Sequence, residues 1–218
     1  MEDFVVWTVP GSPFARAVFL ALEEKGARWR IRALTPMDSK SPAHLARHPF
    51  GRMPAIEHGD FRLYETQAAL RYIDRILPDP LLTPSDPRGE ARMNQLMGVN
   101  DWYFFQQVAA PIVFGRAIAP RFGLPADEAR IAAALPQARV CIGEIARLLG
   151  GQAFMAGDEL SLADLLLAPQ LSFLPAFAEG QDMLEPHANL RAWIERMEAR
   201  PSMAATTWDK MSELARAA

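Results

Sequence analysis

The sequence predicts two domains of different class, an α/β domain over residues 1–78 and an all-helical domain over residues 89–218. Two observations support this prediction. The apolar patterns typical of β-strands fall within the first 65 residues, whereas apolar residues at helical spacing dominate the remainder. Four prolines from residue 78 to residue 87 indicate a proline-rich linker over residues 79–88, because proline interrupts both helices and strands.

The first elements follow in order from their patterns. Phe4–Thr8 is a continuous apolar run, typical of a central strand, and the turn Pro10–Pro13 ends it. From Phe14 onward apolar residues recur at helical spacing as far as Gly26, a residue type common just past a helix end. Apolar side chains alternate with arginines along Trp29–Ala33, which predicts a strand with one solvated face.

The next elements complete the α/β domain. A short helical turn is expected at Pro42–Arg47. Two strands, Met53–Glu57 and Phe61–Tyr64, are joined by His58–Asp60, which indicates a hairpin, and a helix follows over residues 66–77. A β-α-β unit followed by β-β-α is typical of a thioredoxin-like fold, so we expect a thioredoxin-like N-terminal domain.

The second half of the chain has helical patterns only. The expected helices span residues 89–105, 111–122, 126–149, 161–174 and 189–199. Ser161 and Asp164 have the spacing of a capping box, and Leu160 with Leu165 can supply the accompanying hydrophobic staple. We interpret this motif as structural.

Composition argues against several classes of function. A net charge of −3 gives no broad basic surface for nucleic acid or anionic membrane. The acidic N-terminus lacks the pattern of a signal peptide. The longest apolar region, Leu160–Ala178, contains Asp164 and two prolines, which predicts a kinked core helix and not a membrane span.

The single Cys141 cannot form an internal disulfide, so a cytoplasmic location is expected. The histidines are scattered along the sequence, so we predict no metal site.

Ser12 lies between the first strand and the first helix, where a thioredoxin-like domain faces its ligand. Its hydroxyl can donate a hydrogen bond to a bound thiolate, and hydrogen bonding to the charged form lowers a thiol pKa. Alternatively, Ser12 is only the N-cap of the helix. The turn Ser12–Ala15 contains no cysteine, which argues against redox chemistry, and no G-x-S-x-G motif surrounds Ser12, which argues against a serine hydrolase.

Glu65 and Thr66 follow a strand and open a helix, a combination that can hold the head of an α-amino acid. The helix N-terminus favours a carboxylate, Glu65 can pair with an ammonium, and the Thr66 hydroxyl can add a hydrogen bond. A plain capped helix is the alternative. Met53 precedes Pro54 at a strand start, which leaves the Met53 backbone available to an incoming peptide, although an ordinary edge-strand proline gives the same pattern.

Over essentially its full length the chain resembles cytosolic glutathione transferases, and its N-terminal half is most similar to the serine-type phi class. The motifs that carry the resemblance are Ser12, Ala17–Glu24, Lys40–Leu45, His48–Ala55, Tyr64–Thr66, Ser161–Asp164, Trp193 and Arg200–Ser202. Their order and spacing are more specific than any single motif. The resemblance implies a thioredoxin-like domain that binds glutathione and a helical domain that contributes a pocket for an electrophile.

The resemblance also implies residue roles. Ser12 stabilises the glutathione thiolate, Lys40 contacts the glycyl carboxylate, Met53 pairs through its backbone ahead of a cis Pro54, and Glu65 with Thr66 holds the γ-glutamyl head. The chain departs from the phi pattern at Ser39 (usually histidine), Arg52 (usually glutamine) and Thr66 (usually serine). Thr66 keeps a hydroxyl, and Arg52 can reach a carboxylate.

We therefore expect a transferase that attacks small hydrophobic electrophiles with the glutathione thiolate, in an apolar cleft between the domains. Glutathione is the cosubstrate, no metal is required, and the family implies a detoxifying homodimer. Candidate pocket residues are Phe14, Met37, Trp102, Phe105 and Phe114. Alternatives are a glutathione-dependent peroxidase, isomerase or dehalogenase on the same fold, or a non-catalytic binding or scaffold protein.

Overall fold

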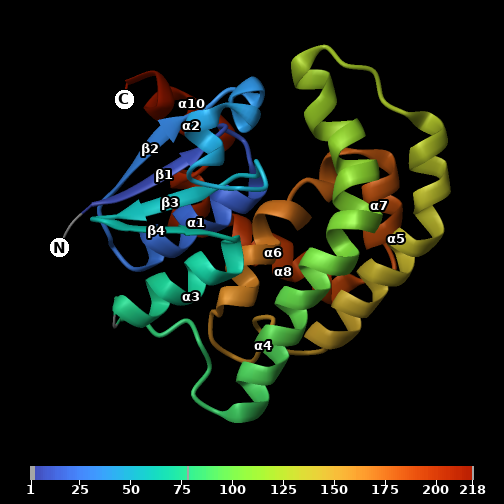
Figure 1. The fold of residues 1–218 in the computed structure, drawn as a ribbon. Helices are drawn as coiled ribbons and strands as arrows, with labels where there is room; N and C mark the ends of the chain where they lie inside the picture. The colour runs from blue at the N-terminus through green and yellow to red at the C-terminus, as the bar shows by residue number, and fades with distance from the viewer. Residues whose placement is uncertain (1–2, 78, 218) are drawn as a thin grey trace. The chain divides into compact units, whose positions relative to one another are not determined.

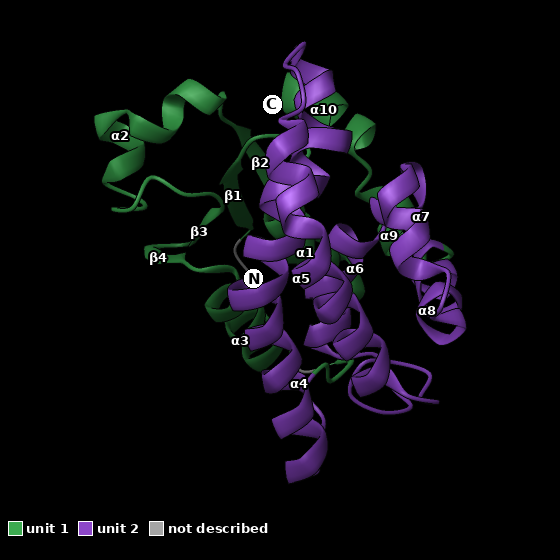
Figure 2. Ribbon diagram, turned by 90° about the vertical axis from the view of Figure 1, so that its right-hand side faces the viewer, with its two compact units in different colours: residues 1–82, 199–218 green, residues 83–198 purple. Residues whose placement is uncertain are grey.

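The computed structural model describes residues 3–77 and 79–217, which divide into two compact units (Figures 1 and 2). Unit 1 combines the chain up to Leu82 with the chain from Ala199 onward. Unit 2 runs from Thr83 to Glu198. The expected helical domain of residues 89–218 differs from unit 2 at the C-terminus, because the last helices pack on elements of unit 1.

Unit 1 is built on a four-stranded mixed sheet. The strands are β1 (Phe4–Thr8), β2 (Trp29–Ala33), β3 (Ala55–His58) and β4 (Phe61–Tyr64), in the spatial order β2-β1-β3-β4. β1 is parallel to β2 and antiparallel to β3, and β3 is antiparallel to β4. This confirms the predicted thioredoxin-like topology.

The helices of unit 1 are α1 (Pro13–Glu24), a 3₁₀ helix (Pro36–Lys40), α2 (Pro42–Leu45), α3 (Thr66–Ile76), α9 (Pro201–Ala205) and α10 (Trp208–Ala217). α1 carries an almost unbroken buried run from Ala15 to Leu22 because it packs on both α3 and α9. α9 and α10 were not predicted, since their short apolar patterns give little periodic signal.

One strand begins later than its pattern predicts. The predicted strand included Met53, but β3 begins at Ala55, and the Met53–Pro54 peptide bond is cis. Proline has no backbone N–H to donate to a ladder, so pairing starts after it. His58 belongs to β3 and pairs with Phe61, which leaves a tight turn between the two strands.

The named secondary-structure elements in the described part of unit 2 are all helices (Figure 1). Its elements are α4 (Pro87–Val99), a π-helical segment (Asn100–Ile118), a 3₁₀ helix (Ala119–Phe122), α5 (Glu128–Leu149), α6 (Leu162–Leu171), a 3₁₀ helix (Leu174–Ala176), α7 (Ala178–Leu184) and α8 (Ala188–Glu198). Cys141 lies buried in α5, where burial raises the pKa of its thiol to about 12.

The predicted break between residues 105 and 111 is wrong, because the π-helical segment continues through Pro111. Proline removes one backbone donor from a helix, but Pro111 is buried in the extensive packing of this segment on α5, and that packing maintains the helix. Asn100, at its start, accepts a buried hydrogen bond from Gln170 at 2.7 Å.

The predicted capping box at the start of α6 is confirmed. Asp164 accepts from the Ser161 backbone N–H at 2.9 Å and from its hydroxyl at 2.7 Å. The same carboxylate also accepts from the Met155 N–H and from the Trp193 indole, each at 2.8 Å. Asp164 is therefore the centre of a buried network that is larger than the sequence motif indicates.

None of the helices in the described part of the chain combines the length and apolar character needed to cross a membrane. The apolar region around α6 is instead the core of unit 2, since every residue from Leu162 to Leu171 is buried.

Candidate functional site

The strand register brings the segments predicted to bind ligand to one end of the sheet in unit 1. Thr8 at the end of β1 lies opposite Ala33 at the end of β2. Ala55 at the start of β3 lies opposite both Trp7 and Tyr64. The chain therefore enters or leaves all four strands here, and this end of the sheet carries the loops with Ser12, Lys40, Arg52–Pro54 and Glu65–Thr66.

Ser12 is the N-cap of α1. Its Oγ accepts a hydrogen bond from the Ala15 N–H at 3.3 Å, and its own N–H donates to the Val9 carbonyl at 3.3 Å. The capping bond uses a lone pair of the oxygen, so the hydroxyl hydrogen stays available. Among the described residues, none accepts that hydrogen. The cap and the donor role, which the sequence left open as alternatives, are thus compatible in one side chain.

Glu65 has an unusual backbone conformation for a residue with a side chain. Its φ is 71°, the one positive φ among the described non-glycine residues. Such conformations cost on the order of 1–3 kcal/mol and occur often at functional sites. Glu65 is the N-cap residue of α3, yet its side chain makes no capping bond and is exposed, while Thr66 beside it is buried. The Glu65 carboxylate is therefore not occupied by the helix.

Lys40 and Arg52 lie near each other across Gly51. A Cβ built on Gly51 would lie 3.4 Å from Lys40 Nζ and 2.7 Å from the Ser39 carbonyl oxygen, and Gly51 has a φ of 62°. Glycine is therefore required both for its conformation and for the close approach. Both cationic side chains are exposed at the end of the sheet, where they can attract a carboxylate.

Two buried histidines support this loop, and the sequence interpretation missed them. His44 Nε2 donates to the Arg52 carbonyl oxygen at 2.8 Å. The His48 ring packs on Tyr64 with centroids 4.7 Å apart. Burial lowers the pKa of His48, and the charges of His44 and Arg52 lower it further. His44 and His48 are four residues apart, in and just after the short helix α2. This spacing was the signal in the sequence that could have identified them.

These features define the candidate clamp, which consists of Ser12, Lys40, Arg52, Met53, Pro54, Glu65 and Thr66. Two cations can hold one carboxylate, the N-terminus of α3 can hold a second, and Glu65 can hold an ammonium. The Ser12 hydroxyl can donate to an anionic atom. The clamp is thus chemically suited to a small zwitterionic peptide with a nucleophilic group.

The five predicted pocket residues are divided between the units. Phe14 and the 86% exposed Met37 belong to unit 1. Trp102, Phe105 and Phe114 lie on the π-helical segment of unit 2, where Trp102 is 70% exposed. They are mostly accessible rather than core side chains, so their assignment to a pocket stays a prediction.

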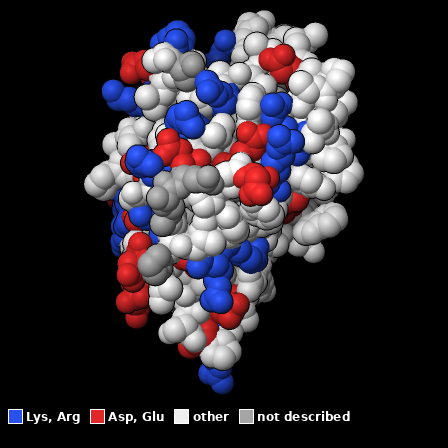
Figure 3. Space-filling view, turned by 60° about the vertical axis from the view of Figure 1, so that its left-hand side comes forward, with Lys and Arg blue, Asp and Glu red and all other residues white. Residues whose placement is uncertain are grey.

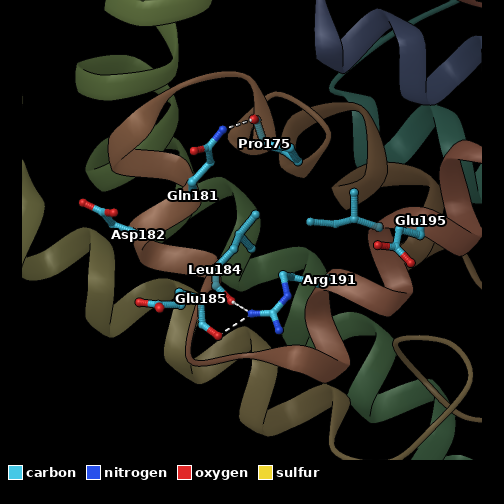
Figure 4. A pocket seen from close by; sticks show the side chains of 8 residues that line it. Pro175, Gln181, Asp182, Leu184, Glu185, Arg191 and Glu195 are labelled. Atoms are coloured by element: carbon cyan, nitrogen blue, oxygen red, sulfur yellow. Dashed lines mark hydrogen bonds between the residues drawn. The ribbon is translucent and has the colours of Figure 1, made fainter.

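A separate pocket of about 540 Å³ lies within unit 2 between α7 and α8 (Figure 4). It is lined by Pro175, Gln181, Asp182, Leu184, Glu185, Arg191, Ile194 and Glu195. Its one arginine donates to the carbonyls of Leu184, at 2.9 Å, and of Glu185, so three carboxylates dominate the rim. A site with this charge does not suit an anionic peptide, and no residue of the clamp contributes to it.

On the face that Figure 3 shows, basic and acidic side chains are interspersed and no extended basic patch forms. In the parts of the chain that the structure describes, no group of three His, Cys, Asp or Glu side chains could hold a metal ion.

Comparison with known proteins gives consistent matches. The family model for the glutathione S-transferase N-terminal domain matches residues 2–75, and that for the C-terminal domain matches residues 105–201. Glutathione S-transferase F12 of Arabidopsis thaliana is 31% identical over 202 residues, which cover 91% of this chain and 92% of the relative.

Solved structures agree with these matches. The apo structure of glutathione S-transferase III has a TM-score of 0.83 at 28% identity, with 94% of this chain and 95% of that one covered. Glutathione S-transferase I from mais, in complex with an atrazine glutathione conjugate, has a TM-score of 0.80 at 26% identity, with 98% of each chain covered.

Proposed function

This chain belongs to the glutathione S-transferase family, and we propose that it joins the glutathione thiolate to small apolar electrophiles. The relatives are plant transferases of the phi class, in agreement with the resemblance of the N-terminal half. The mais enzyme is in complex with an atrazine glutathione conjugate, which supports conjugation of glutathione to a small molecule here.

The charges of the clamp support a specific orientation for glutathione. Glu65 would pair with the γ-glutamyl ammonium, and Thr66 with the N-terminus of α3 would hold the carboxylate of the same group. Lys40 and Arg52 would hold the glycyl carboxylate. The Met53 backbone, outside the strand ladder, would pair with the cysteinyl unit and direct its sulfur toward Ser12.

Ser12 would activate the thiol by donating its hydroxyl hydrogen to the sulfur. A free thiol has a pKa near 8.5, so only a few per cent is ionised at neutral pH. A hydrogen bond to a charged group contributes about 1.5–3 kcal/mol, which corresponds to lowering that pKa by roughly one to two units. The thiolate then forms a C–S bond with the electrophilic carbon, and the leaving group departs with its electron pair.

The observation that carries this proposal is the unclaimed hydroxyl hydrogen of Ser12 at the end of the sheet where the clamp segments converge. It is tested by titrating the protein and Ser12→Ala with glutathione while following the ultraviolet absorbance of the thiolate. We expect both proteins to bind glutathione, with a thiolate band at neutral pH in the wild type alone.

Two controls make this experiment decisive. S-methyl glutathione, which has no ionisable thiol, should bind without giving the band. Ser12→Thr, which keeps the hydroxyl, should retain part of it. Equal thiolate bands in wild type and Ser12→Ala would contradict the role of Ser12, and absence of binding would contradict the clamp itself.

We also propose a homodimer, as the family resemblance implied. Phe50 supports this proposal, because its ring is 68% exposed while it packs edge-on against Tyr64 at a centroid distance of 6.2 Å. Sedimentation should give twice the chain mass of 24.2 kDa for the wild type. Phe50→Ala should shift the protein toward the monomer, and an unchanged dimer would place the interface elsewhere.

A further inference from the structure

The C-terminal segment of residues 199–217, here called the C-terminal strap, runs back along α1. Near the end of α1, Glu24 accepts from Nε and Nη2 of Arg200, at 2.8 and 2.7 Å, and from the Ser202 hydroxyl at 2.5 Å. One strap residue therefore makes a two-point ion pair with α1, an arrangement that fixes orientation as well as distance.

The contacts continue toward the start of α1. Arg16, one turn after Ser12, donates to the Met203 carbonyl at 2.9 Å and to the Thr206 hydroxyl at 3.4 Å. The order of contacts is reversed between the two segments, so the strap is antiparallel to α1. It reaches the turn that precedes the helix, where Ser12 lies.

At that turn the indole of Trp208 covers Gly11. A Cβ added to Gly11 would lie 2.3 Å from both Cδ2 and Cε2 of Trp208, closer than any real contact allows. Gly11 also has a φ of 88°, a conformation that residues with a side chain rarely adopt. The ring therefore lies directly against the backbone of the residue before Ser12.

Core packing alone does not account for α10. Met211 is the one buried residue among the described residues of this helix, and Trp208 itself is only half-buried. A helix with so little buried surface contributes little hydrophobic stabilisation. α10 packs on β2, and its first residue, Trp208, also lies against Gly11, the residue before the proposed catalytic Ser12.

We propose that Trp208 is a positioning residue that restrains Gly11 and so holds the Ser12 hydroxyl in line with the glutathione sulfur. This inference rests on the proposed role of Ser12. Glycine can adopt several backbone conformations at this turn, and each would direct the next side chain differently. A displacement of about 1 Å can lower a rate roughly a hundredfold, so restraining the turn affects thiol activation more than it affects binding.

The test compares Trp208→Ala with Trp208→Phe, and uses Leu214→Ala, an exposed position on the same helix, as the matched control. Thiolate absorbance of bound glutathione is titrated with pH, and kcat and KM are measured with a chlorodinitrobenzene. Trp208→Ala should raise the pH midpoint of the bound thiolate by about one unit and lower kcat at neutral pH about tenfold. The dissociation constant for glutathione should change less than about threefold, because the groups that bind its two ends are untouched.

Trp208→Phe keeps a flat ring against Gly11 and should restore most of the wild-type midpoint, while Leu214→Ala should match the wild type. A wild-type midpoint in Trp208→Ala would overturn the positioning role and leave the function of Ser12 intact. A wild-type protein that binds glutathione without any thiolate band would instead overturn the role of Ser12. If Trp208→Ala does not fold, Trp208→Leu, which keeps apolar bulk without the flat ring, decides the question in the same titration.

Discussion

Ser12 and Ser161 are two of the serines that begin helices in the described chain, and the side chain three residues later gives them different uses. Ser12 is followed by Ala15, whose N–H is the one partner of its hydroxyl oxygen among the described residues. Ser161 is followed by Asp164, which accepts both the hydroxyl hydrogen and the backbone N–H of the serine. Ser161 is 1% exposed, whereas Ser12 is half-buried.

The comparison shows what distinguishes a structural cap from a candidate catalytic donor. An acid three residues after the cap consumes the hydroxyl hydrogen, and an alanine leaves it free for a ligand. Residue type at the cap alone carries no such information, since serine caps both helices.

The largest expected effect tests the structural side of this comparison. Asp164→Ala should lower the free energy of unfolding by about 3–5 kcal/mol, because several buried donors lose their acceptor at once. Urea unfolding measures the change, and Asp158→Ala, at an exposed nearby position, should stay within about 0.5 kcal/mol of the wild type. A loss of only about 1 kcal/mol in the free energy of unfolding would show that Asp164 contributes no more than an ordinary helix cap.

Ser12→Ala tests the proposed catalytic role in this comparison. We expect kcat/KM to fall by roughly 10²–10³, or about 2.7–4 kcal/mol of transition-state stabilisation, as for removal of a single donor to a developing or bound anion. The free energy of unfolding should fall by only about 1 kcal/mol, the typical value for a helix cap. Ser161→Ala should show the reverse, with lower stability and unchanged kcat/KM. If Ser12→Ala and Ser161→Ala lost stability and kcat/KM to the same extent, the two serines would not differ in role.

Replacing Glu65 should have a smaller effect, which weakens glutathione binding but raises the free energy of unfolding. Glu65→Gly should weaken glutathione binding by roughly 10–100-fold, because a charged hydrogen bond contributes about 1.5–3 kcal/mol. The same change should raise the free energy of unfolding by up to about 1 kcal/mol, since glycine tolerates the φ of 71°. Calorimetric titration and thermal unfolding measure the two. Glu65→Gln, which keeps a side chain, should weaken binding without the gain in stability.

The smallest effect tests the C-terminal strap through pH. Burial raises the pKa of Glu24, but hydrogen bonds from Arg200 and Ser202 outweigh it and hold that pKa below its usual value. Its contribution to stability is therefore fully present above the unfolded pKa of about 4.3 and is lost as pH falls through the lower folded value. Glu24→Gln should cost about 1 kcal/mol at neutral pH and little in acid, by urea unfolding. A difference that persists in acid would show that charge is not the cause.

The sequence predicted the elements whose signals are local. Strands such as Phe4–Thr8 and the capping box of α6 matched because alternation, apolar runs and cap spacing lie within a few residues. Ser12 and Glu65 were predicted as site residues from the same kind of signal, as polar residues at helix starts, and their roles stay predictions.

Long-range packing explains what the sequence did not reveal. The helix through Pro111 persists because its surroundings compensate for a lost donor, and the positive φ of Glu65 is imposed by the junction of β4 and α3. The strap reaches α1 across more than 170 residues of chain, as the separation of Glu24 from Arg200 shows. No window of residues contains both partners, so periodicity alone cannot detect the contact.

The strap also separates the order of synthesis from the order of folding. Domains generally fold as units during translation, starting from the N-terminus. Unit 1, however, includes the chain from Ala199 onward, so it is discontinuous. The ribosome completes all of unit 2 before it releases α9, one of the two helices that pack on α1. Helices translated after unit 2 therefore complete the domain that precedes it.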